Sequence, residues 1–296
     1  MIRRKAQNAV KDWIDNGKDA FLITGARQIG KTYLIRQCLK ESGIPYIELN
    51  FIEQPELVEL FQGAKDVKEI LMRLSLVVKE PLKKGKTILF LDEIQEFKDI
   101  VTRIKFLVEE GSFRYIMSGS LLGVELNDLR SAPVGYMRIY DMYPLDFKEF
   151  AQAAGVHDGT FEQLYTHFKE RTPVDEFVHA KMLDVFYLYL IIGGMPEAVS
   201  TYIETNDLAQ VAQVHNKIIR LYKKDFSKYE HRYKLKLQEI YDAMPGQLDQ
   251  KNKRFQLNSL GKGISYDRVA NDFLWLKDAG VAIPVYNISE PKSPLI

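Results

Sequence analysis

The chain has 296 residues, 46% of them hydrophobic, which permits a large buried core and suggests two or three folding units. Its formal net charge of +1 gives no reason to expect tight nucleic-acid binding, so any such binding would have to come from a local patch. A single cysteine, Cys38, excludes a disulfide framework and fits a reducing compartment.

The amino-terminal charges are not followed by an apolar segment, so we expect no signal peptide. The most apolar run, residues 185–192, is much shorter than the roughly 20 residues that span a bilayer. These features predict a cytoplasmic protein that has no membrane partner.

Residues 21–32, FLITGARQIGKT, match the pattern G-x-x-x-x-G-K-[ST] between an apolar strand and a predicted helix. Glycines let the backbone fold around an anion, so that N–H groups and the positive end of the following helix point at phosphates. In such a loop Lys31 reaches the β- and γ-phosphates and the Thr32 hydroxyl ligates Mg²⁺.

Residues 87–93, TILFLDE, predict a parallel strand that is buried on both faces and ends in two acids. Asp92 is placed to hold Mg²⁺, and Glu93 to orient and deprotonate the attacking water. The alternative is that the strand simply reaches solvent there. Adjacent acids favour hydrolysis over transfer to a small acceptor. The lack of an N-K-x-D motif favours ATP over GTP, and the lack of L-S-G-G-Q argues against a transporter-type ATPase.

Two further strand ends supply weaker candidates. Residues 113–117 form another predicted core strand, and Ser118 or Ser120 after it could sense the γ-phosphate or the water. A helix-capping or turn serine is the alternative. Asn50 ends the strand at residues 45–50 and is expected either to hold Glu93 in an inactive rotamer or to form a turn.

The predicted ligands are therefore ATP and Mg²⁺, with Glu93 and Lys31 as catalytic residues and with Thr32 and Asp92 at the metal. The predicted nucleotide-binding residues are Gly25, Ala26, Arg27, Gln28, Ile29, Gly30, Lys31, Thr32, Tyr33, Asp92 and Ser118.

Strands and helices alternate over residues 1–155, which predicts an α/β domain with a parallel sheet covered by helices on both faces. Four candidate residues, Gly25, Asn50, Asp92 and Ser118, then fall at the carboxyl ends of separate strands, where ligands bind in such sheets. A helical domain is expected over residues 156–232. A winged-helix-like domain is expected over residues 233–296, ending in a strand at 281–288.

Six segments in this order resemble a large prokaryotic family of P-loop ATPases: GARQIGKT, LDEIQEF, YPLDFKEF, GGMPEAV, KDFSKY and WLKDAG. That family joins an AAA-type domain to a C-terminal domain of unknown function. The resemblance implies an ATP-binding core of the AAA+ and signal-transducing ATPase kind, a helical segment and a winged helix. In relatives it also implies a later domain resembling restriction endonucleases. This chain stops about where that domain would begin, so no nuclease activity is assigned.

ATPases of this kind often complete the site with an arginine finger, in cis or across a homo-oligomer interface. Arg27, Arg130 and Arg138 are the candidates.

Basic residues cluster near the junction with the third domain, at Lys223, Lys224, Lys228, Arg232, Lys234 and Lys236, and again at Lys251, Lys253 and Arg254. The helix that would enter a DNA groove carries Asp267, Asp272 and Asp278, which repel phosphates. A solvated or protein-docking face is therefore favoured over DNA binding.

The predicted function is Mg²⁺-dependent ATP hydrolysis that drives a conformational change in the helical and winged-helix parts. We expect slow turnover by the isolated chain and faster turnover with an oligomer or partner. The alternative is a nucleotide-gated switch with negligible turnover that docks DNA or a protein. A small-molecule kinase is disfavoured because the chain is too long and too helical after the sheet.

Overall fold

The computed structural model describes residues 2–78, 82–120, 135–226, 231–261 and 263–285. The chain divides into two compact units, Met1–Arg220 and Leu221–Ile296. The predicted domain boundaries at residues 155 and 232 stay predictions.

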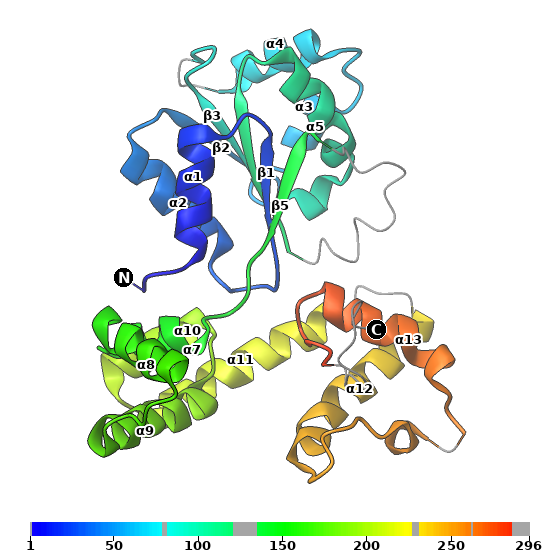
Figure 1. Cartoon of the computed structure of the whole chain (residues 1–296). Coiled ribbons are helices and arrows are strands. Elements are labelled where there is room, and N and C mark those ends of the chain that lie inside the picture. Colours follow the sequence, from blue (N-terminus) through cyan, green and yellow to red (C-terminus); the bar gives the residue numbers. More distant parts are fainter. Residues whose placement is uncertain (1, 79–81, 121–134, 227–230, 262, 286–296) are drawn as a thin grey trace. The chain divides into compact units, whose positions relative to one another are not determined.

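The first unit contains a five-stranded parallel sheet in the order β2-β3-β4-β1-β5 (Figure 1). Every residue of β1 and of β3 is buried, as expected for continuous apolar runs in a sheet covered on both faces. The predicted α/β class is confirmed. The strands are β1 (Ala20–Thr24), β2 (Tyr46–Asn50), β3 (Ile88–Asp92), β4 (Arg114–Ser118) and β5 (Met137–Asp141).

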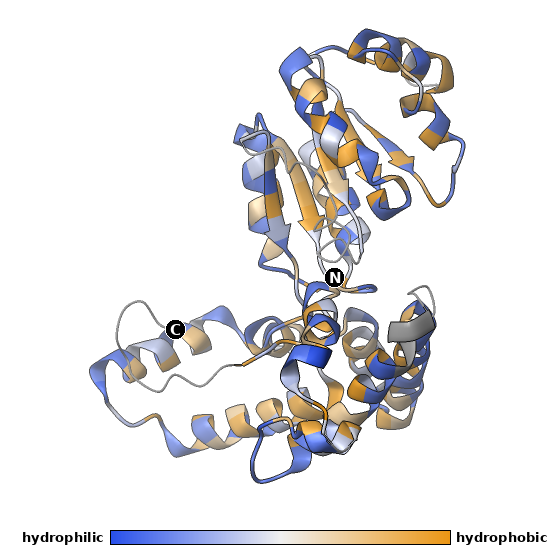
Figure 2. Cartoon of the chain, turned by 90° about the vertical axis from the view of Figure 1, so that its right-hand side faces the viewer, coloured by the Kyte–Doolittle hydropathy of each residue, from blue (hydrophilic) through white to orange (hydrophobic). Residues whose placement is uncertain are grey.

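Helices cover both faces of the sheet (Figure 1). On one face, Trp13 of α1 stacks on Phe21 of β1 with ring centroids 5.9 Å apart. On the other face, α3, α4 and α5 share a buried apolar cluster with the strands. Figure 2 shows the apolar strands between helices of mixed polarity. The helices are α1 (Ala6–Asn16), α2 (Lys31–Ser42), α3 (Leu57–Phe61), α4 (Val67–Val77), the 3₁₀ helix η1 (Ile94–Phe97) and α5 (Asp99–Glu110).

The strand order brings the predicted site residues to one edge. Asn50 is in register with Asp92, and Ser118 with Ile23, so β1 to β4 all end at this edge. The chain leaves β1 toward β2, whereas the connections after β3 and β4 run in the opposite direction. Ligands of doubly wound sheets bind at such a reversal, outside the carboxyl ends of the strands.

Helices follow the sheet in the chain, as predicted, and the last of them, α11, continues past the end of the first unit at Arg220. The helices of this helical part are α7 (Phe147–Ala153), α8 (Asp158–Glu170), α9 (Glu176–Ile192), α10 (Pro196–Thr205) and α11 (Leu208–Phe226). Gly193 ends α9 with φ +72°, and Pro196 begins α10. Across the ranges that the structure describes, no helix has both the length and the apolarity needed to cross a bilayer.

The second unit contains α12 (His231–Asp249), the 3₁₀ helix η2 (Leu257–Leu260) and α13 (Tyr266–Asp278). Val269, Trp275 and Leu276 of α13 are buried, and so is Asp272. Residues 281–285 of the strand predicted at 281–288 form no strand, and the others lie outside the described residues. The winged helix therefore stays a prediction.

Candidate functional site

The loop between β1 and α2 has the backbone of an anion-binding turn. Gly25, Gln28 and Gly30 have positive φ values of 136°, 63° and 90°. A Cβ at Gly25 would lie 2.1 Å from the carbonyl oxygen of Met142, so only glycine fits there. Gly30 is the N-cap of α2 and makes no side-chain capping bond, which leaves the first amides of the helix to an anion.

Lys31 lies folded against this loop with its side chain buried. Its Nζ donates to the carbonyl oxygens of Gly25 at 3.0 Å and Ala26 at 2.7 Å, and to Ser120 Oγ at 3.1 Å. Burial lowers the pKa of Lys31 to about 8, although the carboxylates of Glu93 and Asp92 oppose that shift. The ammonium group is thus held where the loop and β4 meet.

Asp92 is the most buried carboxylate of the site, with a relative exposure of 1%. It accepts hydrogen bonds from Thr32 Oγ1 at 3.0 and 3.1 Å, from Asn50 Nδ2 at 3.1 Å and from Ser118 Oγ. Burial raises the pKa of Asp92, and the Ser118 and Thr32 hydroxyls act against that rise. The structure therefore brings together the predicted metal pair, Thr32 and Asp92, with Ser118 beside them.

Glu93 follows Asp92 with left-handed backbone angles, φ 57° and ψ 45°, and its side chain is half-buried. Such a conformation is uncommon for a residue other than glycine, and strained residues of this kind cluster at active sites. Gln95 Nε2 donates to Glu93 Oε2 at 2.6 Å, while Gln95 Oε1 accepts from the backbone N–H of Ser120 at 3.0 Å. Gln95 therefore holds the carboxylate of Glu93.

The prediction that Asn50 holds Glu93 is wrong. Asn50 is in register with Asp92, so its amide nitrogen reaches that carboxylate. Its Oδ1 accepts from the backbone N–H groups of Ile52 and Glu53, both at 3.0 Å, in a turn. Gln95 was not among the predicted site residues, although a glutamine two residues after Glu93 was a usable signal.

The other predicted nucleotide-binding residues differ in how exposed they are. Ala26 and Ile29 are buried in the loop, Arg27 and Gly30 are half-buried, and Gln28 and Tyr33 are exposed beside it.

Of the two arginine-finger candidates outside the loop, Arg130 stays a prediction and Arg138 is too far from the loop in the same chain. Arg130 lies outside the described residues. Arg138 pairs in register with Phe21, near the amino end of the strands, and its guanidinium lies 3.4 Å from Asp12 and 3.5 Å from Asp19. Because the loop is at the opposite edge, Arg138 cannot reach it from the same chain.

A cavity of about 580 Å³ adjoins the loop. The loop and α2 contribute Ile29, Gly30 and Tyr33, and the helical part contributes Leu145 and Pro196. Ile2 and Arg4 of the amino-terminal segment close another side. The walls are largely apolar with a few polar groups, as in sites that take flat organic ligands. No sequence pattern predicts this cavity, because its walls come from segments far apart in the chain.

The parallel sheet and the glycine-containing loop before α2 resemble those of P-loop proteins. Residues 17–151 match the family described as AAA domain, and residues 183–294 match a domain of unknown function (DUF8612). The two matches stand in the order that the resemblance implied, an AAA domain followed by a domain of unknown function.

Two solved structures are similar to this chain, and the first of them supports the fold. A Walker-type ATPase of Pyrococcus abyssi is similar with a TM-score of 0.55 and 15% identity, over 94% of this chain and 90% of that chain. AMPPCP-bound DnaA from Aquifex aeolicus has a TM-score of 0.42 and 13% identity, over 94% of this chain and 90% of that chain. No curated protein sequence matches this chain.

Proposed function

We propose that the chain binds ATP together with Mg²⁺ and hydrolyses it to ADP and phosphate. The observation that carries this proposal is the convergence of Lys31, Thr32, Asp92 and Glu93 at one edge of the sheet. The match of residues 17–151 to an AAA domain supports it.

In this proposal the loop binds the phosphates of the nucleotide and the cavity binds its adenosine moiety. Amides from Gly25 to Thr32 would surround the phosphates, and Lys31 would exchange its loop carbonyls for β- and γ-phosphate oxygens. The cavity of about 580 Å³ beside Gly30 is a suitable size for the adenosine moiety. Its walls include Tyr33 from the sheet domain and Pro196 from α10. Nucleotide would thus contact the helical part, and this is how binding would be coupled to conformational change.

The metal site is built from oxygen donors. The Thr32 hydroxyl and the Asp92 carboxylate fit Mg²⁺, which takes one or two protein oxygens and completes its shell with water and phosphate. The described residues hold no group of three His, Cys, Asp or Glu side chains that could bind a metal by themselves. When bound, Mg²⁺ would neutralise charge on the β- and γ-phosphates.

Glu93 would act as the general base. It follows the buried Asp92 directly, and its carboxylate is near enough to Lys31 to oppose the lowering of that lysine's pKa, which supports a position beside the proposed metal and phosphates. To accept a proton from water it must have a carboxylate oxygen free of Gln95. An arginine finger from Arg27 or from a second copy of the chain would accelerate this step.

The second candidate is a nucleotide-gated switch with negligible turnover. The bond between Gln95 and Glu93 favours it, because a base held by an amide is a poorer proton acceptor. In this alternative the ATP-bound chain docks a protein or DNA, and the exposed cations of the second unit include Lys251, Lys253 and Arg254.

Nucleotide titration and phosphate release test the proposal. Lys31→Ala should abolish ATP binding, whereas Lys40→Ala, at an exposed lysine of the same helix, should leave it unchanged. Glu93→Gln should bind ATP normally and lose about 10²- to 10⁴-fold in turnover, the usual contribution of a general base. Full activity in Glu93→Gln would remove Glu93 from the mechanism. Normal ATP binding by wild type without phosphate release would favour the switch.

A further inference from the structure

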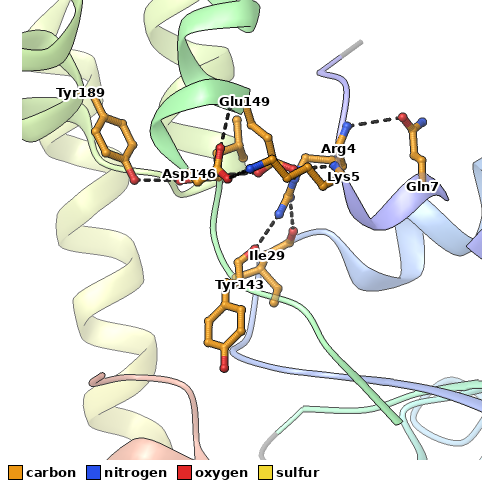
Figure 3. Close-up of polar contacts among 9 residues, drawn as sticks. Arg4, Lys5, Gln7, Ile29, Tyr143, Asp146, Glu149 and Tyr189 are labelled. Atoms are coloured by element: carbon orange, nitrogen blue, oxygen red, sulfur yellow. Dashed lines mark hydrogen bonds and ion pairs between the residues drawn. The ribbon is translucent and has the colours of Figure 1, made fainter. Parts of the chain in front are cut away.

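Arg4 is a buried arginine that lies in the segment before α1, outside every recognised motif. Its relative exposure is 9%, and buried guanidinium groups are rare unless they are paired. Nη1 donates to the carbonyl oxygen of Ile29 at 3.0 Å, and Nη2 donates to that of Tyr143 at 2.5 Å (Figure 3). Nε lies 3.4 Å from Glu149 Oε1. One side chain thus connects the phosphate loop, the segment after β5, and α7.

The contact with Ile29 bears on how the loop presents its amides. In a trans peptide the C=O of one residue and the N–H of the next point in opposite directions. Because Arg4 holds the Ile29 carbonyl toward the amino-terminal segment, the N–H of Gly30 is directed to the other side of the loop. A carbonyl oxygen turned inward would instead repel a phosphate.

We propose that Arg4 is a positioning residue for the triphosphate, which fixes the Ile29–Gly30 peptide so that the loop is ready for phosphate before nucleotide arrives. This inference rests on the proposed function. Arg4 acts through the peptide and need not contact the ligand.

Glu149 and Tyr143 give Arg4 a rigid support. Glu149 belongs to the capping box of α7: its Oε2 accepts from Asp146 N at 3.1 Å, and its own N–H donates to Asp146 Oδ1 at 2.9 Å. Its Oε1 also accepts from the backbone N–H of Lys5 at 2.6 Å (Figure 3). Arg4 is therefore held by an anion that is itself fixed by hydrogen bonds.

The segment after β5, residues 142–145, lies against the phosphate loop at one end, is joined to it through Arg4 near the other, and continues to the helical part. The carbonyl of Met142 lies against Gly25, and the carbonyl of Tyr143 shares Arg4 with Ile29. Two residues on, Leu145 N donates to Gly194 O at 2.7 Å, and Tyr189 Oη donates to Leu145 O at 2.9 Å. Order in the loop is thereby connected through Arg4 to α9 and to the start of α10.

The test compares two probes with the full chain. ATP with Mg²⁺ fills loop and cavity, whereas inorganic triphosphate with Mg²⁺ occupies the loop alone. Arg4→Gln is expected to weaken both by the same factor, about 10- to 100-fold, as for loss of a charge-assisted hydrogen bond. Arg4→Lys should restore only part of this, because one ammonium cannot replace the planar fork. The matched control is Arg3→Gln, whose side chain is 72% exposed and paired with Asp158 at the surface.

Each outcome decides the inference. Wild-type affinity for both probes in folded Arg4→Gln overturns it. Weaker ATP binding with unchanged triphosphate binding also overturns it, since Arg4 would then contact the nucleoside. If the single variant does not fold, Arg4→Gln with Glu149→Gln removes both buried charges together, and the same comparison is made there. Failure of wild type to bind either probe refutes the proposed function instead.

Discussion

The side-chain amide of Gln95 donates to the carboxylate of Glu93 at 2.6 Å, and its carbonyl oxygen accepts from the backbone N–H of Ser120 at 3.0 Å. Ser120 Oγ in turn accepts from Lys31 Nζ at 3.1 Å. Hydrogen bonds thus run from the proposed base to the proposed phosphate-binding lysine. A triphosphate that draws Lys31 away from Ser120 would break the hydrogen bond through which Lys31 is linked to Gln95 and Glu93.

Gln95→Ala should raise the turnover of ATP severalfold, because Glu93 Oε2 would be free to accept a proton. The change in kcat should exceed any change in KM, since the Gln95 side chain hydrogen-bonds to Glu93 and to the backbone N–H of Ser120. Phosphate release under steady-state conditions measures both constants.

Glu96→Ala is the matched control, because Glu96 is exposed on the same 3₁₀ turn. A lower kcat in Gln95→Ala would contradict the prediction and would mean that Gln95 orients Glu93 for catalysis.

ATP affinity should depend on pH through Lys31, because burial lowers the pKa of this lysine to about 8. A bound triphosphate favours the ammonium form, so binding above that pKa takes up a proton. Affinity should be constant below about pH 8 and should fall by up to about tenfold per pH unit above it. Calorimetry in buffers of different ionisation enthalpy reports the proton uptake directly.

Lys31→Arg provides the comparison, because arginine stays charged throughout this range. Any binding that this variant retains should lack the decline. An unchanged wild-type affinity well above pH 8, without proton uptake, would show that Lys31 does not titrate as described.

Gly25→Ala should destabilise the first unit by about 1–3 kcal/mol or more, the cost of a strained backbone plus a steric clash. At φ 136° the new Cβ would lie 2.1 Å from the Met142 carbonyl oxygen, so the segment after β5 must move. Thermal unfolding measures the loss, and nucleotide binding should fall with it.

Gly43→Ala gives the reference for glycine strain alone. Gly43 has φ 67° but a Cβ there would meet nothing within 4 Å, so its cost should be smaller. Equal losses at the two positions would rule out the clash with Met142.

Duplex DNA should leave phosphate release unchanged. On α13, Asp272 is buried and so cannot repel DNA, but exposed Asp267 stands beside exposed Arg268 and offsets its charge. Fluorescence anisotropy at low and physiological salt measures any binding. Salt-dependent affinity that Lys253→Glu weakens would contradict this expectation and would support a nucleic-acid partner.

Local sequence patterns determined the central elements of this protein. The spacing of Gly25, Gly30 and Lys31 and the apolar run before Asp92 predict loop and strand, because each pattern lies within a few contiguous residues. Parallel strands then bring their carboxyl ends to one edge, so the meeting of Thr32, Asp92 and Ser118 could also be expected.

Tertiary structure alone decided which side chains support that centre. Gln95 rather than Asn50 holds Glu93, because the register of β2 on β3 places Asn50 at Asp92. Arg4 reaches Ile29 across 25 positions of sequence. Such contacts depend on how distant segments pack against one another, and neither hydrophobic periodicity nor motif spacing records that packing.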